Sequence, residues 1–325
     1  MRRFLLLSLL ACTGSLYERA AERRFRARFR PPGRVVEING HALHLLCMGE
    51  RWPGRPTVIF EAGHGAWSSA WQKVMPEIAK ITRVCAADRA GYGWSADAPA
   101  PRLPERMVAD LHALLEACGE RGPYLFVGHS MGAALGRLFA SRYPEEVLGM
   151  VWVDSAHEEM LSYMPVGRWA FTLMTAGCWL GALLARVGLL RVTGLGRVIA
   201  RYPAVSDLRD YAALLEQVTA PLYLETLAHE TRTLTDPSGW AGTRPHFGSL
   251  PVTMLEAQYP NLLPMPLLTP FWRKFRQGWG RLQDNLAQRS NNIRRIQVPC
   301  GHNVQNESPE LIVEEVRGMI RRLEN

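Results

Sequence analysis

Short strand-like runs alternate with helical runs along most of this chain, and this alternation limits the possible folds more than any other feature. The strand-like runs are rich in β-branched and aromatic residues, whereas the runs between them repeat apolar residues at helical spacing. The predicted strands are 34–38, 41–48, 57–61, 83–88, 124–127, 148–153, 252–256 and 293–298. The predicted helices are 67–80, 103–118, 131–143, one within 271–288, and 309–323. Such an order indicates an α/β protein with a mostly parallel eight-stranded sheet covered by helices on both faces.

One long segment interrupts the alternation. Residues 155–249 contain helical runs and no clear strand, so we interpret them as a helical cap over the carboxyl edge of the strands, where such sheets bind ligands. The predicted organisation is therefore an arm (1–33), a core (34–154 and 250–325) and a cap (155–249). Within the cap, 169–185 is uncharged, and we interpret it as a buried helix lining an apolar pocket. Contact with a membrane surface and a membrane span are the alternatives.

The positive charge of the chain belongs to its N-terminal arm. The net charge is +8, but residues 1–34 hold nine arginines against Glu18 and Glu22, so the remaining residues carry only about +1. A nearly neutral domain argues against a nucleic-acid partner. The uncharged stretch 4–17 is shorter than the ~20 residues of a membrane span, and it fits an anchor, a cleaved signal or a disordered arm. We expect a membrane surface as a partner of this arm, and a membrane-associated or exported protein rather than a cytoplasmic one.

Cysteines and nucleotide motifs give no sign of a cofactor. The six cysteines are scattered without a C-x-x-C pair, so we expect buried apolar side chains or free thiols, and neither a zinc site nor a disulfide framework. The sequence has no H-E-x-x-H, no P-loop and no G-x-G-x-x-G after a strand. We therefore expect neither a metal nor an organic cofactor.

The strongest chemical signal is the sequence GHSMG at 128–132. It matches G-x-S-x-G between a predicted strand and a predicted helix, which is the setting of a nucleophile on a sharp turn. Glycines two residues before and after Ser130 allow that turn, and the helix that starts at Met131 favours negative charge beside the serine. We predict that Ser130 is a nucleophile.

With these motifs in place, the chain from about residue 34 to its C-terminus resembles the α/β-hydrolase fold superfamily. The sequence DRAGYGWS at 88–95 looks like the D-x-x-G-x-G-x-S loop of that family, and Gly301-His302 after the last strand looks like its catalytic-histidine loop. The stretches 61–63, 127–132, 153–157 and 302–309 are most similar to bacterial serine hydrolases with helical caps, which often carry an N-terminal hydrophobic segment. The resemblance implies that His302 is the base and that no cofactor takes part.

The resemblance also implies an oxyanion hole made of two backbone amides. One belongs to Met131, directly after the nucleophile. The other follows a His-Gly pair in the family, and Ala62-Gly63 stands at that place when counted from Trp71, which makes His64 the donor. The pair His64-Gly65 also matches, shifted by two residues, and would make Ala66 the donor instead. We favour His64.

The acid of the triad is the least determined residue. The family most often places it near positions 260 and 261, which are proline and asparagine here. Some members place it directly after the sixth strand, where Asp154 stands. We favour Asp154, and Glu256 and Asp284 are the alternatives.

A serine at position 130 argues against the chemistry of epoxide hydrolases and haloalkane dehalogenases, family members whose turn presents an aspartate that forms an alkyl ester. We therefore expect a serine hydrolase that cleaves a carboxylic ester with a hydrophobic acyl or alcohol group through an acyl-enzyme. Thioesterase, lactonase, carbon–carbon hydrolase, perhydrolase and aminopeptidase activities are the enzymatic alternatives. A small-molecule receptor built on the same fold is the alternative outside enzymes.

Overall fold

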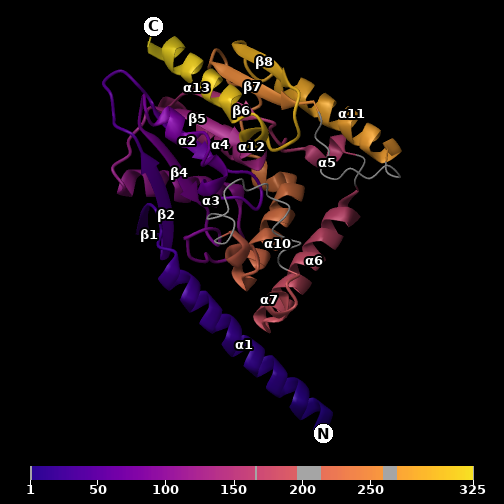
Figure 1. Cartoon of the computed structure of the whole chain (residues 1–325). Helices are drawn as coiled ribbons and strands as arrows, with labels where there is room; N and C mark the ends of the chain where they lie inside the picture. The colour runs from indigo at the N-terminus through magenta and orange to yellow at the C-terminus, as the bar shows by residue number, and fades with distance from the viewer. Residues whose placement is uncertain (1, 165–166, 196–213, 259–268, 325) are drawn as a thin grey trace.

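A computed structural model of the chain describes residues 2–164, 167–195, 214–258 and 269–324, and eight strands form one sheet in it (Figure 1). The strand order is β1-β2-β4-β3-β5-β6-β7-β8. The strands are β1 (Arg34–Ile38), β2 (His41–Met48), β3 (Thr57–Glu61), β4 (Val84–Asp88), β5 (Tyr124–His129), β6 (Val147–Val153), β7 (Val252–Ala257) and β8 (Ile293–Val298). β2 pairs antiparallel with β1 and β4, and every other pairing is parallel. The predicted sheet is confirmed.

The central strands are apolar on both sides because both faces of the sheet are covered. In β5, Phe126 packs into one hydrophobic cluster, whereas Leu125 and Val127 pack into the other. β3 repeats this pattern, with Ile59 on the first side and Val58 and Phe60 on the second. Near-continuous apolar strands are what a parallel sheet between two helical layers requires.

Helices from distant parts of the chain build the two layers. One cluster contains residues of α3 (Pro104–Ala117), α4 (Met131–Arg142) and α11 (Thr269–Leu286), and the other contains residues of α2 (Met75–Ile78) and α13 (Pro309–Glu324). The remaining core elements are η1 (Ser68–Trp71), η2 (Pro144–Glu146) and α12 (Val304–Glu307). The single helix expected over 67–80 was wrong. Its residues form η1 and α2 with a turn between them, and Pro76, which has no amide hydrogen to donate, lies in the first turn of α2.

The segment between β6 and β7 contains helices and no strand among its described residues. These helices are α5 (Met160–Tyr163), α6 (Arg168–Arg186), α7 (Leu189–Val192), α10 (Pro221–Thr235) and η3 (Pro237–Trp240). A third hydrophobic cluster joins this segment to the core, with Tyr223 of α10 packed against Trp67 and Tyr92. The interpretation of 169–185 as a buried helix was wrong for its large side chains, because only small residues of α6 are buried (Thr175, Cys178, Ala182 and Ala185).

The N-terminal arm forms helix α1 (Arg2–Arg28), which runs below α7 and projects from the body of the protein (Figure 1). Its contacts are with the cap: the side chain of Glu18 accepts a hydrogen bond from Arg191 Nε at 2.7 Å. None of the described helices combines the length and the apolar content that a membrane span requires.

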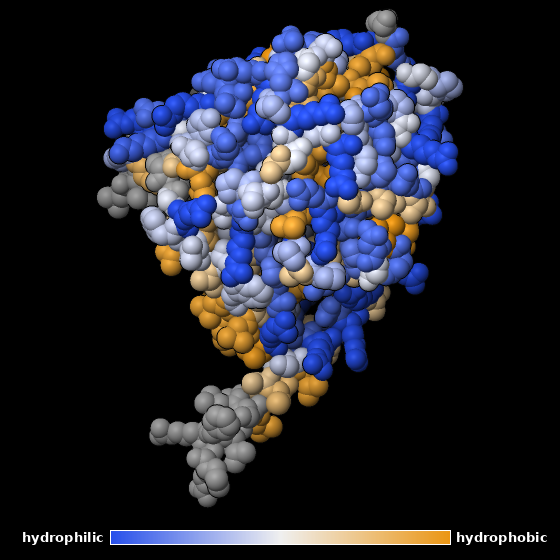
Figure 2. Space-filling view, turned by 180° about the vertical axis from the view of Figure 1, so that it is seen from behind, coloured by the Kyte–Doolittle hydropathy of each residue, from blue (hydrophilic) through white to orange (hydrophobic). Residues whose placement is uncertain are grey.

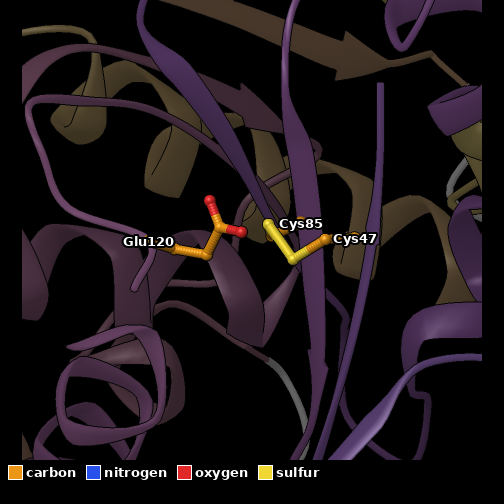
Figure 3. A group of neighbouring side chains, drawn as sticks. All are labelled: Cys47, Cys85 and Glu120. Atoms are coloured by element: carbon orange, nitrogen blue, oxygen red, sulfur yellow. A yellow bond between two sulfur atoms is a disulfide. The ribbon is translucent and has the colours of Figure 1, made fainter. Parts of the chain in front are cut away.

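A disulfide joins β2 to β4, which corrects the expectation that all cysteines are thiols. Cys47 and Cys85 are register partners in the antiparallel pair, with Cα atoms 4.1 Å apart (Figure 3). The sequence gives no sign of this bond, because strand register, and not cysteine spacing, brings the two residues together across a separation of 38 positions.

Glu120 lies beside the disulfide, and together the three residues resemble a metal-binding group (Figure 3). The carboxylate of Glu120, however, accepts hydrogen bonds from Arg83 at 2.6 Å and from Arg51 at 2.9 Å. With both sulfur atoms in a disulfide and the carboxylate paired with two guanidinium groups, these residues do not fit an ion.

The disulfide predicts how many thiols react before and after reduction. We expect four reactive thiols in the denatured, unreduced protein and six after reduction, because Cys12, Cys118, Cys178 and Cys300 are free. Titration with a chromogenic thiol reagent in denaturant measures both numbers. Reduction should also lower the free energy of unfolding by about 2–4 kcal/mol, because the cross-link limits the unfolded chain. A Cys47→Ala/Cys85→Ala variant is the control whose stability reduction leaves unchanged, and six thiols before reduction would contradict the disulfide.

Candidate active site

Ser130 lies on a strained turn between β5 and α4. Its φ of 51° is in the left-handed region, which non-glycine residues seldom adopt. Backbone hydrogen bonds hold the strain: the Ser130 amide donates to Val153 O, and Ser130 O accepts from the amides of Ala133 and Ala156. The neighbouring strand β6 and the helix thus fix the serine at the carboxyl edge of the sheet.

Two glycines make the turn possible by their lack of a side chain. A Cβ on Gly128 would lie 2.5 Å from the backbone of Ala133, and one on Gly132 would lie 2.2 Å from Glu61 O. Both contacts are with backbone atoms, so flexible side chains cannot relieve them. The glycines of the G-x-S-x-G motif therefore bring α4 against β5 and the end of β3.

Asp154 and His302 meet at the same edge. His302 Nδ1 lies 2.5 Å from Asp154 Oδ2, and the carboxylate is fully buried. Asp154 directly follows β6 and has a φ of 39°, so a second strained residue stands beside the first. The second carboxylate oxygen accepts from Trp279 Nε1 at 2.9 Å and from the Ala257 amide at 3.1 Å.

The other two candidate acids are bound elsewhere. Glu256 pairs with Arg295 at 2.7 Å, and Asp284 pairs with the same arginine at 2.6 Å. Positions 260 and 261 lie outside the described residues. Among the described candidates, only Asp154 has a hydrogen bond to His302.

Trp279 is a residue that the sequence reasoning missed. Besides its hydrogen bond to Asp154, its indole ring stands edge-on to the His302 ring, with centroids 5.5 Å apart. It belongs to α11, 125 residues after Asp154 in the chain. No motif marks it, so only the folded arrangement identifies it as a positioning residue for both members of the pair.

His129 packs between the serine turn and the His302 loop. Its Nε2 lies 2.8 Å from His302 O, so this nitrogen carries the proton and donates it to the carbonyl. Burial, followed by the neighbouring His302 ring, lowers the pKa of His129 to about 3. The ring is therefore neutral at physiological pH and supports the loop without adding charge to the site.

The segment 61–66 passes directly over the serine turn. A Cβ on Gly63 would lie 3.3 Å from Ser130 Cβ, which shows how closely this loop approaches. Two of its amides are engaged: Ala66 donates to Gly63 O at 3.2 Å, and Gly65 donates to Glu230 Oε2 at 3.3 Å. The His64 side chain points to the cap, where its Nε2 lies 3.1 Å from Thr231 Oγ1, and burial lowers the pKa of its ring.

A buried arginine connects this loop to the cap. Arg89 donates to the carbonyls of Ala62 and Gly63 and forms ion pairs with Glu61 at 2.6 Å and Glu230 at 2.7 Å. Burial alone would lower the pKa of Arg89, but the two carboxylates outweigh it and raise that pKa. Tyr92 OH adds a hydrogen bond to Glu230 at 2.9 Å. Arg89 stands in the 88–95 motif, whereas Glu230 of α10 has no sequence signal.

Three histidines away from the serine turn have acidic partners. His41 lies 3.2 Å from Asp110, His44 lies 2.8 Å from Asp88, and His112 lies 2.9 Å from Glu146. Burial raises the pKa of Cys300 to about 11, so its thiol stays protonated although it stands two residues before His302.

Comparison with known proteins identifies the fold of this chain. A family described as the α/β-hydrolase fold matches residues 56–173. An AB hydrolase superfamily protein of Gibberella zeae is 27% identical over 83% of this chain and 87% of its own length. The uncharacterised protein YqjL of Bacillus subtilis is 36% identical, but the match covers 40% of this chain and only 51% of YqjL. The chain thus spans about half the length of that relative.

Solved structures agree on the fold. An ancestral haloalkane dehalogenase superposes with a TM-score of 0.69 at 18% identity, covering 90% of this chain and 99% of the other. A thermophilic esterase from Thermogutta terrifontis superposes with a TM-score of 0.63, also at 18% identity, covering 90% and 100%. At this identity the likeness shows a shared fold.

The packing at the serine turn predicts a stability difference between two glycine substitutions. Gly128→Ala should lower the free energy of unfolding by about 1–3 kcal/mol or more, because its methyl group overlaps the backbone of α4. Gly280→Ala is the matched control, since a Cβ there meets nothing within 4 Å and alanine favours the helix by up to about 1 kcal/mol. Chemical denaturation measures both. Equal stabilities of the two variants would contradict the close packing at position 128.

His129 predicts a specific loss of stability in acid. The unfolded side chain binds a proton below about pH 6.5, whereas the folded one binds it only near pH 3, so the folded state loses stability as the pH falls between these values. This loss amounts to about 2 kcal/mol from about pH 7.5 to about pH 5. His129→Gln keeps a donor to His302 O and removes the titration, so its stability should fall less over that range. If the curves of unfolding free energy against pH were parallel for the wild type and His129→Gln, the ring of His129 would not be buried in its neutral form.

Proposed function

We propose that this chain, which has the α/β-hydrolase fold, is a serine hydrolase that cleaves carboxylic esters with a hydrophobic acyl or alcohol group. The fold and the matched hydrolases support hydrolysis as the reaction class. The observation that carries the proposal is the position of Ser130 on its strained turn, at the same sheet edge as the hydrogen-bonded Asp154–His302 pair.

In the proposed mechanism Ser130 Oγ attacks the ester carbonyl, and His302 accepts the proton of the serine. The protonated ring then gives this proton to the leaving alcohol, which leaves an acyl group on Ser130. A water molecule that His302 deprotonates then attacks the acyl-enzyme, and the protonated ring returns this proton to Ser130 Oγ as the acid is released. Asp154 would hold the ring with Nδ1 protonated and stabilise the imidazolium. These steps use only side chains, backbone amides and water.

Backbone amides at two places support His64 and Met131 as the oxyanion donors. Of the two donors that the sequence offers in this loop, Ala66 already donates to Gly63 O, and the neighbouring Gly65 amide donates to Glu230, which favours His64 over Ala66. Met131 N begins α4, where the first amides have no partner within the helix. Two such amides stabilise the negative charge that develops on the carbonyl oxygen.

Three features of Asp154 support it as the acid. It bonds His302 directly, it is completely buried, and Trp279 and the Ala257 amide hold its second oxygen. Glu256 and Asp284 instead share Arg295 as a partner.

A hydrophobic substrate group is supported by the residues where cap and core meet. Trp67, Tyr92, Tyr223 and Leu224 form one buried cluster there, next to the loop that would hold the oxyanion. Apolar side chains beside the site favour an apolar substrate group over a charged one because they offer few partners for charge.

Substitution of the triad residues tests the mechanism. Ser130→Ala should abolish both labelling by a fluorophosphonate probe and hydrolysis of p-nitrophenyl esters. Asp154→Asn should lower kcat by about 10³–10⁴-fold, because the asparagine amide cannot stabilise the imidazolium. Glu256→Gln is the matched control and should keep near wild-type activity. Steady-state kinetics with esters of increasing chain length, on variants checked for folding by circular dichroism, supply the measurement.

The outcomes separate the alternatives. A folded protein that the probe does not label would exclude the serine hydrolase and favour a small-molecule receptor. A large loss in Glu256→Gln with activity retained in Asp154→Asn would identify the other acid. Faster turnover of a thioester, a lactone or a peptide than of any ester would keep the triad but replace the substrate class.

A further inference from the structure

Exposed hydrophobic side chains are concentrated on the helices that lie around the N-terminal arm. Of the sixteen large hydrophobic residues that are exposed in the described part of the chain, twelve lie in α1, α6, α7 or the residues that follow α7. They are Leu9, Leu16, Tyr17, Trp169, Leu173, Met174, Trp179, Leu180, Leu183, Leu189, Val192 and Leu195. Single exposed hydrophobic residues are ordinary, but such a concentration indicates an interaction surface.

Helix α6 presents the clearest part of this surface. Its buried residues Thr175, Cys178, Ala182 and Ala185 lie on one side, where the helix packs against α10. Successive residues are 100° apart around a helix, so Trp169, Leu173, Leu180 and Leu183 form a stripe on the opposite side. These four are each 58–67% exposed. A helix that covers a protein core usually turns polar residues outward, whereas α6 has no charge between Arg168 and Arg186.

Helix α1 is fixed to this end of the cap by two close contacts. Gly14 lies so near that a Cβ on it would be 1.9 Å from Val187 O, at the end of α6. Glu18 and Arg191 form an ion pair at 2.7 Å, with only 5% and 9% of their side chains exposed. A buried ion pair of this kind specifies a docked position for the helix. The hydrophobic surface of α6 and α7 therefore continues onto α1.

The arm brings positive charge to the edge of the same surface. Arg19, Arg23, Arg24, Arg26 and Arg28 are exposed on α1, whereas Glu18 is buried in its ion pair. Figure 2 shows hydrophobic side chains gathered at the lower end of the molecule where the arm leaves it, with hydrophilic side chains beside them. An apolar area bordered by arginines matches the acyl chains and the negative headgroups at the surface of an anionic bilayer.

We propose that α1, α6 and α7 form a docking surface for an anionic phospholipid bilayer. The hydrophobic stripe of α6 and the exposed residues of α7 would enter the interface, and the arginines of α1 would contact the headgroups. Trp169, Trp179 and Tyr17 suit the boundary between headgroups and acyl chains, because their rings combine an apolar body with a polar group. A second copy of the chain fits this surface less well, since pairing would bring two arms of +7 together.

Vesicle flotation of the full chain tests the docking surface. We expect the protein to float with vesicles of phosphatidylcholine containing about 30% phosphatidylglycerol, and to do so less at high salt, because screening weakens the contribution of the arginines. Leu173→Ser/Leu180→Ser/Leu183→Ser should reduce the bound fraction about tenfold or more. Trp52→Ser/Leu103→Ser/Leu148→Ser is the matched control, because these three residues are exposed outside the surface, and its binding should equal that of the wild type.

A second variant tests the charged part of the surface. Arg19→Gln/Arg23→Gln/Arg24→Gln should lose the preference for phosphatidylglycerol over pure phosphatidylcholine. A wild-type chain that floats with neither vesicle, or an α6 variant that floats as well as the wild type, would overturn the proposal. So would a dimer in gel filtration that the α6 variant converts to a monomer without any vesicle binding. Ser130→Ala should float unchanged, which keeps this result independent of the proposed hydrolase activity.

Discussion

The arrangement around Ser130 depends on the ion pairs and hydrogen bonds that the buried guanidinium group of Arg89 forms. A charge inside a protein is tolerated only with partners, and Arg89 has carboxylates from β3 and α10 as well as the carbonyls of the 62–63 loop. Two acids compete for one cation. Burial raises the pKa of Glu61 to about 7 despite the ion pair with Arg89, whereas Arg89 outweighs burial and lowers the pKa of Glu230. Sheet, loop and cap are therefore held together by a single charged cluster.

Much of the fold follows from local patterns that the sequence contains in full. Strand limits agree within two residues because apolar runs between polar turns define them, and Asn39-Gly40 adopts the positive φ angles that its hairpin turn needs. The turn at Ser130 is also determined by local sequence, because the glycines of its motif allow close contacts with the adjacent helix and strand. The proposed base, His302, could be named from the resemblance of its loop after the last strand to the catalytic-histidine loop of the family.

The rest depends on contacts between distant segments, which no local pattern encodes. Trp279 reaches Asp154 from α11, Glu230 reaches Arg89 from the cap, and Cys47 meets Cys85 through strand register. The proposed oxyanion donor is a similar case: the sequence offers His64 and Ala66, and the fold adds that the Ala66 amide already donates to Gly63 O, which supports His64. For helix α6 the sequence prediction was wrong in a different way. An uncharged run predicts contact with an apolar environment, but it does not say whether the protein core provides that environment.

The two proposals meet in the pair of helices α6 and α10. The outer side of α6 carries the hydrophobic stripe, its inner side packs against α10, and α10 contacts the loop at 64–65 through Tyr223, Glu230 and Thr231. In the described part of the chain, α6 and α10 connect the proposed docking surface with the loop whose His64 amide is proposed to hold the oxyanion. If both proposals hold, the helix that docks on the bilayer and the loop that holds the oxyanion share α10 as a packing partner.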